Sequence, residues 1–264
     1  MKLSLVDAFT DTPFSGNAAA VCLLDGEREG AWMQSLAREL GYSETAFLLR
    51  EGARYGLRWF TPTVEVDLCG HATLASAHFL WESGVESVET PLEFATRSGI
   101  LRAARRAGEI ELDFPAEPAR EEPAPAALAA ALGVHPVWSG RNRLDFLLLL
   151  ETEAEIRAIR PDFEGIRRET GGGRGVIVTS RAASPDLDFV SRYFAPAAGI
   201  DEDPVTGSTH CCLGPFWAER LGKRDLRAAQ LSERGGRLSV RVGEGNRVFL
   251  GGSAVTVFRG ELAS

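Results

Sequence analysis

Three residues with groups able to carry a proton stand beside the ends of predicted elements. Glu44 lies in a Ser-Glu-Thr turn between a helical stretch and an apolar strand, and Asp203 precedes Pro204 in a loop that enters a helix. His71 stands in the first turn of another helix, where the helix dipole favours the neutral imidazole. Spacing alone does not separate these residues from structural ones. If they act, the chemistry they predict is proton transfer, and partial burial should raise the pKa of Glu44 toward neutrality.

Two glycine-containing loops, at 67–73 and 201–210, each lead into the N-terminus of a predicted helix. A helix start offers unpaired backbone N–H groups and about +0.5 elementary charge, so two of them aimed at one gap would bind a carboxylate. The N–H groups at Gly70 and Ser208 are the expected donors, and Gly207 allows close approach. The alternative is an ordinary capped helix start, with Thr206 or Ser208 as one cap and Asp67 near the other.

The four cysteines have no C-x-x-C spacing and are expected to be free thiols. Cys69, directly before Gly70, stands where a two-thiol epimerase would carry one thiol, but the matching place in the second half is assigned to Asp203 and Pro204. Cys211 and Cys212 are expected to be small core residues. The glycine run at 171–175 lacks the ending of a phosphate loop, and a turn is the better interpretation.

Internal repeats indicate how these residues are positioned. Ser15 begins SGNAAAVCLL and Ser139 begins SGRNRLDFLLLL, at an offset of 124 residues that becomes 125; RWFTP at 58–62 matches RYFAP at 192–196; and the segments that start at Gly70 and Gly207 match at an offset of 137. Three matches in the same order predict two copies of one fold. The Pro-, Ala- and Glu-rich segment 113–133 places the boundary near Pro118.

Each half is therefore expected to hold several strands around one apolar, buried helix, at 70–83 in the first half and 207–221 in the second. Amphipathic helices are predicted at 32–40 and 153–159. Strand and hairpin patterns cover the segments 64–69, 101–114, 175–180 and 237–262.

Charge and hydropathy exclude several classes of protein. The formal net charge is −8, with 37 acidic against 29 basic residues, which disfavours nucleic acid and anionic membrane surfaces as partners. The start of the sequence lacks a long apolar segment, and DFLLLLE is too short to cross a bilayer. We expect a cytoplasmic protein without membrane association.

Several long segments resemble the phenazine-biosynthesis (PhzF-like) family: VDAFTDTPFSGN, YSETAFLL, FTPTVEVDLCGHATLASA and RYFAPAAGIDEDPVTGSTH. The resemblance implies an α+β, diaminopimelate epimerase-like fold, with two pseudo-symmetric halves that are each a curled, mostly antiparallel sheet around a central helix. It places the halves at 1–117, joined by a returning strand at 252–264, and 118–251, with the active site in the cleft between them.

The resemblance also implies roles for single residues. Glu44 would be the catalytic glutamate, His71 and Asp203 its catalytic partners, and Gly70, Gly207, Ser208 and Asn17 would bind substrate. One departure from the family is Ala18, where a proline is usual. The implied activity is a cofactor-independent, metal-free isomerisation that moves a proton within a small carboxylated molecule, by a homodimer. Two alternatives stay open: a two-base amino-acid epimerase or racemase, and a non-catalytic protein that binds a small acid.

Overall fold

The computed structural model describes residues 1–171 and 175–263 and divides into two compact units. Unit 1 comprises Met1–Phe114 and Phe249–Ser264, and unit 2 comprises Pro115–Val248. Each boundary expected from the sequence lies three residues further along the chain than the boundary in the structure. The predicted turn at 171–175 falls largely on 172–174, which lie outside the described residues.

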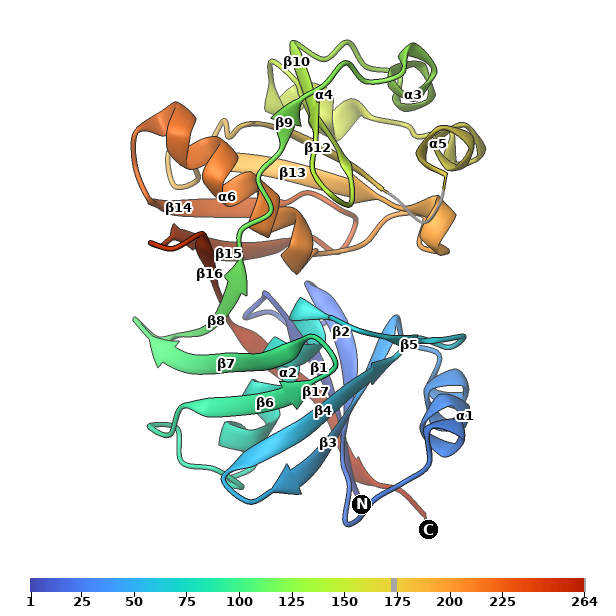
Figure 1. Ribbon diagram of the computed structural model, residues 1–264, viewed down its shortest axis with the longest axis vertical. Helices are drawn as coiled ribbons and strands as arrows, with labels where there is room; N and C mark the ends of the chain where they lie inside the picture. The colour runs from blue at the N-terminus through green and yellow to red at the C-terminus, as the bar shows by residue number, and fades with distance from the viewer. Residues whose placement is uncertain (172–174, 264) are drawn as a thin grey trace. The chain divides into compact units, whose positions relative to one another are not determined.

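Unit 1 is a mixed sheet with two helices (Figure 1). Its helices are α1 (Gly30–Leu40) and α2 (Gly70–Glu82). Its strands are β1 (Lys2–Ala8), β2 (Asn17–Leu23), β3 (Glu44–Glu51), β4 (Arg54–Phe60), β5 (Glu65–Val66), β6 (Leu92–Thr96), β7 (Gly99–Arg106), β8 (Glu109–Pro115) and β17 (Ala254–Glu261).

Unit 2 has the remaining elements. Its helices are α3 (Ala126–Leu132), α4 (Glu153–Ala158), α5 (Phe163–Thr170), the 3₁₀ helix η1 (Pro196–Ala198) and α6 (Gly207–Leu221). Its strands are β9 (Arg120–Glu121), β10 (Trp138–Arg141), β11 (Phe146–Leu149), β12 (Val176–Arg181), β13 (Phe189–Phe194), β14 (Asp225–Gln230), β15 (Gly236–Val242) and β16 (Arg247–Gly252), the last of which runs on into unit 1.

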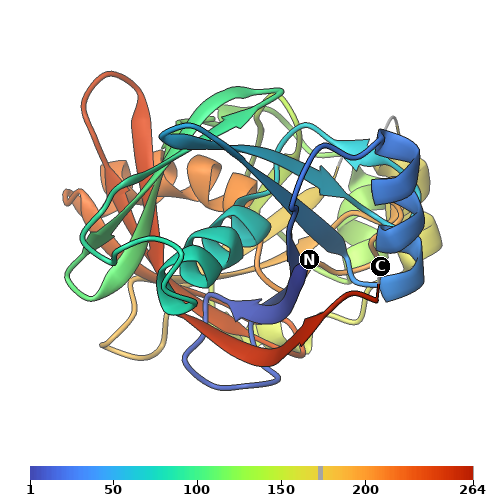
Figure 2. The ribbon, with the colours of Figure 1, turned by 90° about the horizontal axis from the view of Figure 1, so that it is seen from below.

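The helix α2 is the core of unit 1. Eleven consecutive residues, His71–Trp81, are buried, as expected for a helix whose sequence is apolar on every side. It packs against β1, β2, β3 and β17, and Figure 2 shows strands on opposite sides of it. The helix α1 is different: it buries only Met33 and Ala37 and covers the other face of β3.

The strand β17 closes the sheet of unit 1 although it follows all of unit 2 in the chain. It pairs antiparallel with β1, from Lys2 opposite Glu261 to Ala8 opposite Ala254. On α2, His78 lies 3.1 Å from Thr256 Oγ1 of β17, and Glu82 forms a 2.7 Å ion pair with Arg259 of the same strand. Unit 1 is therefore built from both ends of the sequence.

The two units have the same order of strand pairing. In unit 1, β1–β2, β3–β4 and β6–β7 are antiparallel, whereas β2–β3 and β4–β6 are parallel. In unit 2, β10–β11, β12–β13 and β14–β15 are antiparallel, whereas β11–β12 and β13–β14 are parallel. The central helix follows the fourth of these strands in unit 1 and in unit 2. The matching order is what two copies of one fold would give, with a more mixed sheet than the expected antiparallel one.

Matching contacts within each unit support the same conclusion. Arg58 on β4 makes a bidentate pair with Glu65 at 2.7 and 2.8 Å, and Arg192 on β13 makes one with Glu202 at the same distances. Each guanidinium also lies over the phenylalanine two residues along its strand, at 5.1 Å in unit 1 and 4.9 Å in unit 2. The repeated Arg-aromatic-Phe motif thus forms the same cluster in each unit.

Most predicted elements are present. The α+β class is confirmed, and the central helices agree with the expected ranges to within one residue. The strand predicted at 64–69 is wrong except for Glu65–Val66, because the chain there turns into the N-terminus of α2. The helices α3 and α5 were not predicted; α3 lies inside the segment 113–133 that we expect to be a linker. Within the described ranges, no helix is both long and apolar enough to span a membrane.

Candidate active site

Glu44 is the first residue of β3, and its carboxylate is buried beside the start of α2. The residue is 9% exposed, and its Oε2 lies 3.2 Å from His71 Nε2. The geometry of that contact is not that of an aligned hydrogen bond, and Oε2 has no hydrogen-bond partner among residues 1–171 and 175–263. One lone pair of the carboxylate is thus available to a group that enters the site.

His71 stands in the first turn of α2 and is held from two sides. Its Nε2 faces Glu44, and its Nδ1 lies 3.1 Å from Nδ2 of Asn17, the first residue of β2. With the amide in this orientation, Asn17 donates to Nδ1 and the ring proton is on Nε2. If the amide turns by 180°, its oxygen can accept from a protonated Nδ1. Asn17 can therefore accompany either charge state of the ring.

Asn17 is positioned by the glycine before it. Gly16 has φ +65°, and a Cβ at this position would lie 2.2 Å from the Ala8 carbonyl oxygen. Only glycine allows the chain to leave the end of β1 and turn so closely into β2. The Ser-Gly-Asn motif thus brings Asn17 to His71, 54 residues away in the sequence.

Cys69 completes the group as the N-cap residue of α2. Its Sγ lies 3.5 Å from His71 Nδ1 and 3.9 Å from Nε2. Burial raises the pKa of this thiol, and the nearby Glu44 charge raises it further, although His71 opposes the shift. At neutral pH the thiol therefore keeps its proton, and it is a poor base in the resting state.

The charge states of Glu44 and His71 differ from those expected. Burial acts to raise the pKa of Glu44, but the charge of His71 and hydrogen bonds from His71 and Ser43 outweigh it, so that pKa is lowered. Burial acts to lower the pKa of His71, but the Cys69 sulfur and the Glu44 carboxylate raise it well above 6.5. The expected neutral imidazole and raised glutamate pKa are therefore wrong: the two groups form a buried ion pair, whose mutual attraction exceeds the effect of burial and of the helix dipole.

The second set of predicted residues lies in unit 2 and is described by itself. Asp203 is buried and accepts a short hydrogen bond from Thr206 Oγ1. Gln230, at the end of β14, accepts from the Thr206 backbone N–H at 3.0 Å and donates to the Asp203 carbonyl at 2.7 Å. Gln230 was not predicted, since its partners are 24 and 27 residues away and its sequence surroundings show only a strand.

The two central helices start in the same way. Gly70 and Gly207 are their first residues, and within the described part of the chain neither N-cap residue, Cys69 or Thr206, makes a side-chain capping bond. Four residues after each N-cap, a side chain bonds back to its carbonyl: Thr73 Oγ1 at 2.6 Å and His210 Nδ1 at 2.8 Å. The expected cap at Thr206 is thus absent, because its hydroxyl is bonded to Asp203 instead. Ser208 lies in the first turn of α6.

This equivalence corrects one assignment. Cys69 and Thr206 are both N-cap residues and are 137 residues apart, the offset of the helix repeat. The residue that corresponds to Cys69 is therefore Thr206, and not Asp203 or Pro204. A hydroxyl still replaces the second thiol that a two-thiol epimerase needs.

One group of side chains can hold a metal ion. Glu44, Cys69 and His71 each offer a ligand atom, all within 4.8 Å of one another. All three residues are buried.

Comparisons with known proteins agree with this fold and site. The profile described as "Phenazine biosynthesis-like protein" matches residues 6–260. An uncharacterized isomerase of Halalkalibacterium halodurans is 52% identical over 259 residues, which cover 98% of this chain and 97% of that protein. The phenazine biosynthesis-like domain-containing protein 2 of Mus musculus is 39% identical over 287 residues, 100% of this chain and 99% of that one.

Solved structures show the same fold. A phenazine biosynthesis protein of the PhzF family from Enterococcus faecalis has a TM-score of 0.94 at 42% identity and covers 100% of this chain and 99% of its own. A probable proline racemase from Agrobacterium radiobacter has a TM-score of 0.63 at 15% identity over 99% of this chain and 92% of its own, a likeness of fold alone.

Together, the fold and the buried acid-base pair define a protein of the isomerase and epimerase class with the diaminopimelate epimerase-like fold. Within that class, the chain belongs to the phenazine biosynthesis-like (PhzF) family.

Proposed function

We propose that this protein is a cofactor-independent isomerase in which Glu44 moves a proton between two carbon atoms of one small carboxylated substrate. The observation that carries the proposal is the buried Glu44 carboxylate, with Oε2 3.2 Å from the His71 ring and outside any hydrogen bond of the described residues. Relatives named isomerases support the reaction class. A ring-shaped or conjugated acid of the phenazine-precursor type is the substrate class that the family name favours.

The ion pair suggests the order of events. Glu44 is ionised in the resting state because its pKa is lowered, so it can take a proton from a carbon next to an unsaturated or carboxylated centre. Once Glu44 is protonated, the positive charge of His71 loses its partner. That charge then stabilises the negative charge that the substrate has gained. Return of the proton to another carbon restores the ion pair.

Other residues have supporting roles in this proposal. Asn17 holds the His71 ring, and the N–H groups at the start of α2, near Gly70, favour an anionic group of the substrate. Asp203, Gly207 and Ser208 are assigned to substrate binding on the strength of the sequence resemblance, as is the homodimer.

A two-thiol racemase is a weaker candidate. Cys69 is close to His71, but burial and Glu44 raise its pKa, and its counterpart in unit 2 is Thr206. A one-thiol mechanism with Glu44 as the second base would make Cys69 as important as Glu44, which the experiment below measures.

The test is carbon-bound hydrogen exchange in deuterium oxide, followed by NMR, with a dihydro-hydroxyanthranilate and a panel of small unsaturated and α-amino acids. The wild-type protein should convert one of these and place deuterium on the product carbon. Glu44→Gln keeps the shape but removes the base, so turnover should fall by at least about 100-fold with little change in affinity. Cys69→Ser should reduce turnover far less than Glu44→Gln does.

Two results would refute the proposal. One is a Glu44→Gln protein with near-normal turnover. The other is a Cys69→Ser protein that is at least as inactive as Glu44→Gln, which would establish the thiol as an essential acid or base. A protein that binds the acids but exchanges no carbon-bound hydrogen in any of them would instead be a binding protein.

A further inference from the structure

We propose that Glu44, Cys69 and His71 form a reversible binding site for Zn²⁺, and that the bound ion switches off the proton transfer. The second half of this inference rests on the proposed function; the binding itself does not. The cluster combines a carboxylate, a thiol and an imidazole within 4.8 Å, all on buried residues.

The distances fit a tetrahedral ion after small movements. Zinc takes ligand distances of about 2.3 Å to sulfur and about 2.0 to 2.2 Å to nitrogen and oxygen, so its ligand atoms lie about 3.3 to 3.6 Å apart. His71 Nε2 lies 3.2 Å from Glu44 Oε2 and 3.9 Å from Cys69 Sγ. The remaining pair, oxygen and sulfur, is no more than 4.8 Å apart. Side-chain rotation of Cys69 and Glu44 suffices to close that distance.

The ligand types select the ion. A thiolate, an imidazole nitrogen and a carboxylate together suit zinc, whereas magnesium and calcium prefer sites made only of oxygen. Three protein ligands leave a fourth tetrahedral position for water or a substrate oxygen, so the ion does not need a further side chain.

The surroundings already orient the ligands. A zinc-bound histidine usually donates its other ring N–H to a fixed acceptor. If Nε2 binds the ion, Nδ1 faces Asn17, whose amide oxygen can accept that proton after a 180° turn of the amide. Cys69 is fixed as the N-cap residue of α2, where its backbone carbonyl is held by Thr73 Oγ1. The site therefore has an outer layer of polar contacts as well as three ligands.

Binding would remove the groups that the proposed reaction uses. The ion would occupy the lone pair of Glu44 Oε2, which has no hydrogen-bond partner among the described residues. Cys69 must lose its thiol proton to bind zinc, and His71 must be neutral, so zinc takes up a proton-free form of the site and releases the protons to water. A protein in that form has neither the free carboxylate nor the charged imidazole.

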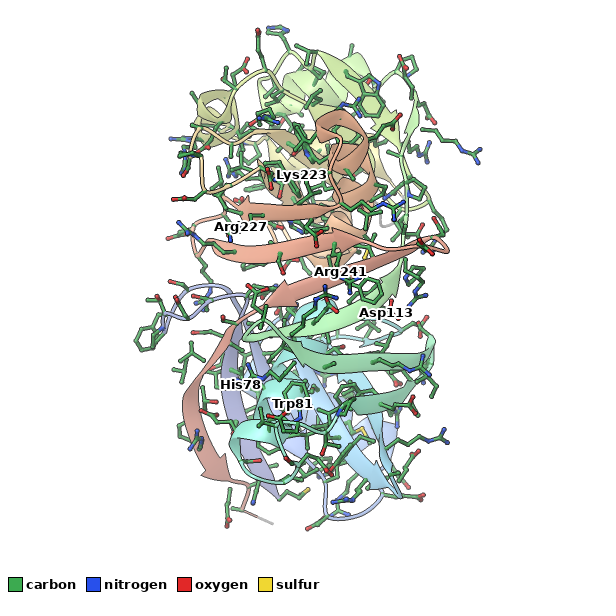
Figure 3. All side chains as sticks on the ribbon, turned by 90° about the vertical axis from the view of Figure 1, so that its left-hand side faces the viewer. His78, Trp81, Asp113, Lys223, Arg227 and Arg241 are labelled. Carbon is green, nitrogen blue, oxygen red and sulfur yellow. The ribbon has the colours of Figure 1, made fainter. Side chains whose placement is uncertain are left out.

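A second histidine-carboxylate pair provides a control. His78 and Glu82, one helical turn apart on α2, have Nε2 and Oε2 3.2 Å apart, and Figure 3 labels His78 on that helix. Thr256 contacts both residues, and Arg259 pairs with Glu82. This pair has two possible ligands in place of three and a cation beside it. We expect no zinc binding there.

The experiment is calorimetric titration of the whole, chelator-treated and reduced chain with Zn²⁺, together with absorption spectra after addition of Co²⁺. Wild-type protein should bind one zinc ion per chain and show a thiolate-to-cobalt charge-transfer band. Cys69→Ser and Glu44→Gln should each weaken zinc binding by at least about 100-fold, and Cys69→Ser should remove the band. Asn17→Ala should weaken binding by about 10-fold. His78→Gln and Cys22→Ser are the matched controls and should bind as the wild type does.

Circular dichroism confirms that each variant is folded before its affinity is compared, and two ligand variants guard against loss of one to misfolding. Zinc binding that is absent, unchanged in Cys69→Ser and Glu44→Gln, or lost in His78→Gln would overturn the inference. Zinc should also stop carbon-bound hydrogen exchange by the wild type. Binding at this cluster without inhibition would remove the regulatory half of the inference. Near-normal turnover of Glu44→Gln would instead overturn the proposed function and leave the zinc site in place.

Discussion

The contact between Glu44 and His71 sets the charge of both side chains. A glutamate with a lowered pKa gives stability that is complete above about 4.5 and is lost as the pH falls through its folded pKa. A histidine with a raised pKa gives stability that is complete below about 6.5 and is lost as the pH rises through its folded pKa. Between these two values both contributions are present together.

Histidine NMR can test this ion pair directly. In the wild type, His71 should titrate with a midpoint well above 6.5, because Glu44 favours its charged form. In Glu44→Gln the carboxylate is gone and burial disfavours the charge, so the midpoint should drop. The buried His210, whose pKa burial lowers to about 4, is the internal control and should not move. A wild-type His71 midpoint below 6.5 would contradict the ion pair.

At this scale, the sequence identifies the residues but not their charges. The Ser-Glu-Thr turn and the Gly-His pair indicate Glu44 and His71, yet each side chain alone would be expected to be neutralised by burial. The contact that reverses this joins residues 27 positions apart, and Asn17 comes from 54 positions away. A local pattern carries no information about such distances.

At the scale of elements, the repeated arginine clusters are equal in geometry but not in burial. The Arg192 side chain is 11% exposed and also donates to the Ile156 and Ile159 carbonyls. The Arg58 side chain is 35% exposed. Because water screens the more exposed pair, the two clusters should differ in their contribution to stability.

We expect Arg192→Ala to lower the free energy of unfolding by about 3 kcal/mol and Arg58→Ala by about 1 kcal/mol. Urea unfolding of the two variants and the wild type measures both losses. Arg102→Ala, which breaks an exposed pair with Glu93, is the control and should have almost no effect. Equal losses for Arg58→Ala and Arg192→Ala would show that burial does not decide the strength of these clusters.

Elements follow from the sequence where their pattern is strong. The apolar helices at α2 and α6 are predicted well, because few charges and many small residues leave no other arrangement that buries them. The segment 126–132 was not recognised as α3, since alanine-rich sequence next to several prolines is also typical of a linker. Pairing order and the role of Gln230 depend on contacts across the sheet and cannot be predicted from one segment.

At the scale of the whole molecule, the two units depend differently on the order of the chain. Unit 2 is one continuous stretch, Pro115–Val248, with its own core that includes Leu148, Val178 and Phe194. Unit 1 needs β17 to cover β1 and to contact α2. Without that strand, the edge of β1 and part of the apolar surface of α2 are exposed to water.

Removal of 253–263 should therefore unfold unit 1 while unit 2 stays folded. Near-ultraviolet circular dichroism and limited proteolysis of the shortened chain measure this, and we expect protection only of a fragment close to 115–248. Addition of a synthetic peptide with the sequence of β17 should restore part of the protection of unit 1. A shortened chain that resists proteolysis throughout would show that β17 is dispensable.

The place of β17 also has a consequence for synthesis on the ribosome. Domains usually fold in the order in which they emerge, with the N-terminal one first. Here β1 to β8 leave the ribosome early but cannot complete their sheet until 254–261 have been made, after all of unit 2. The first-made strands therefore wait with an open edge, and a nascent chain stalled near residue 240 should be the form of this protein that binds chaperones most strongly.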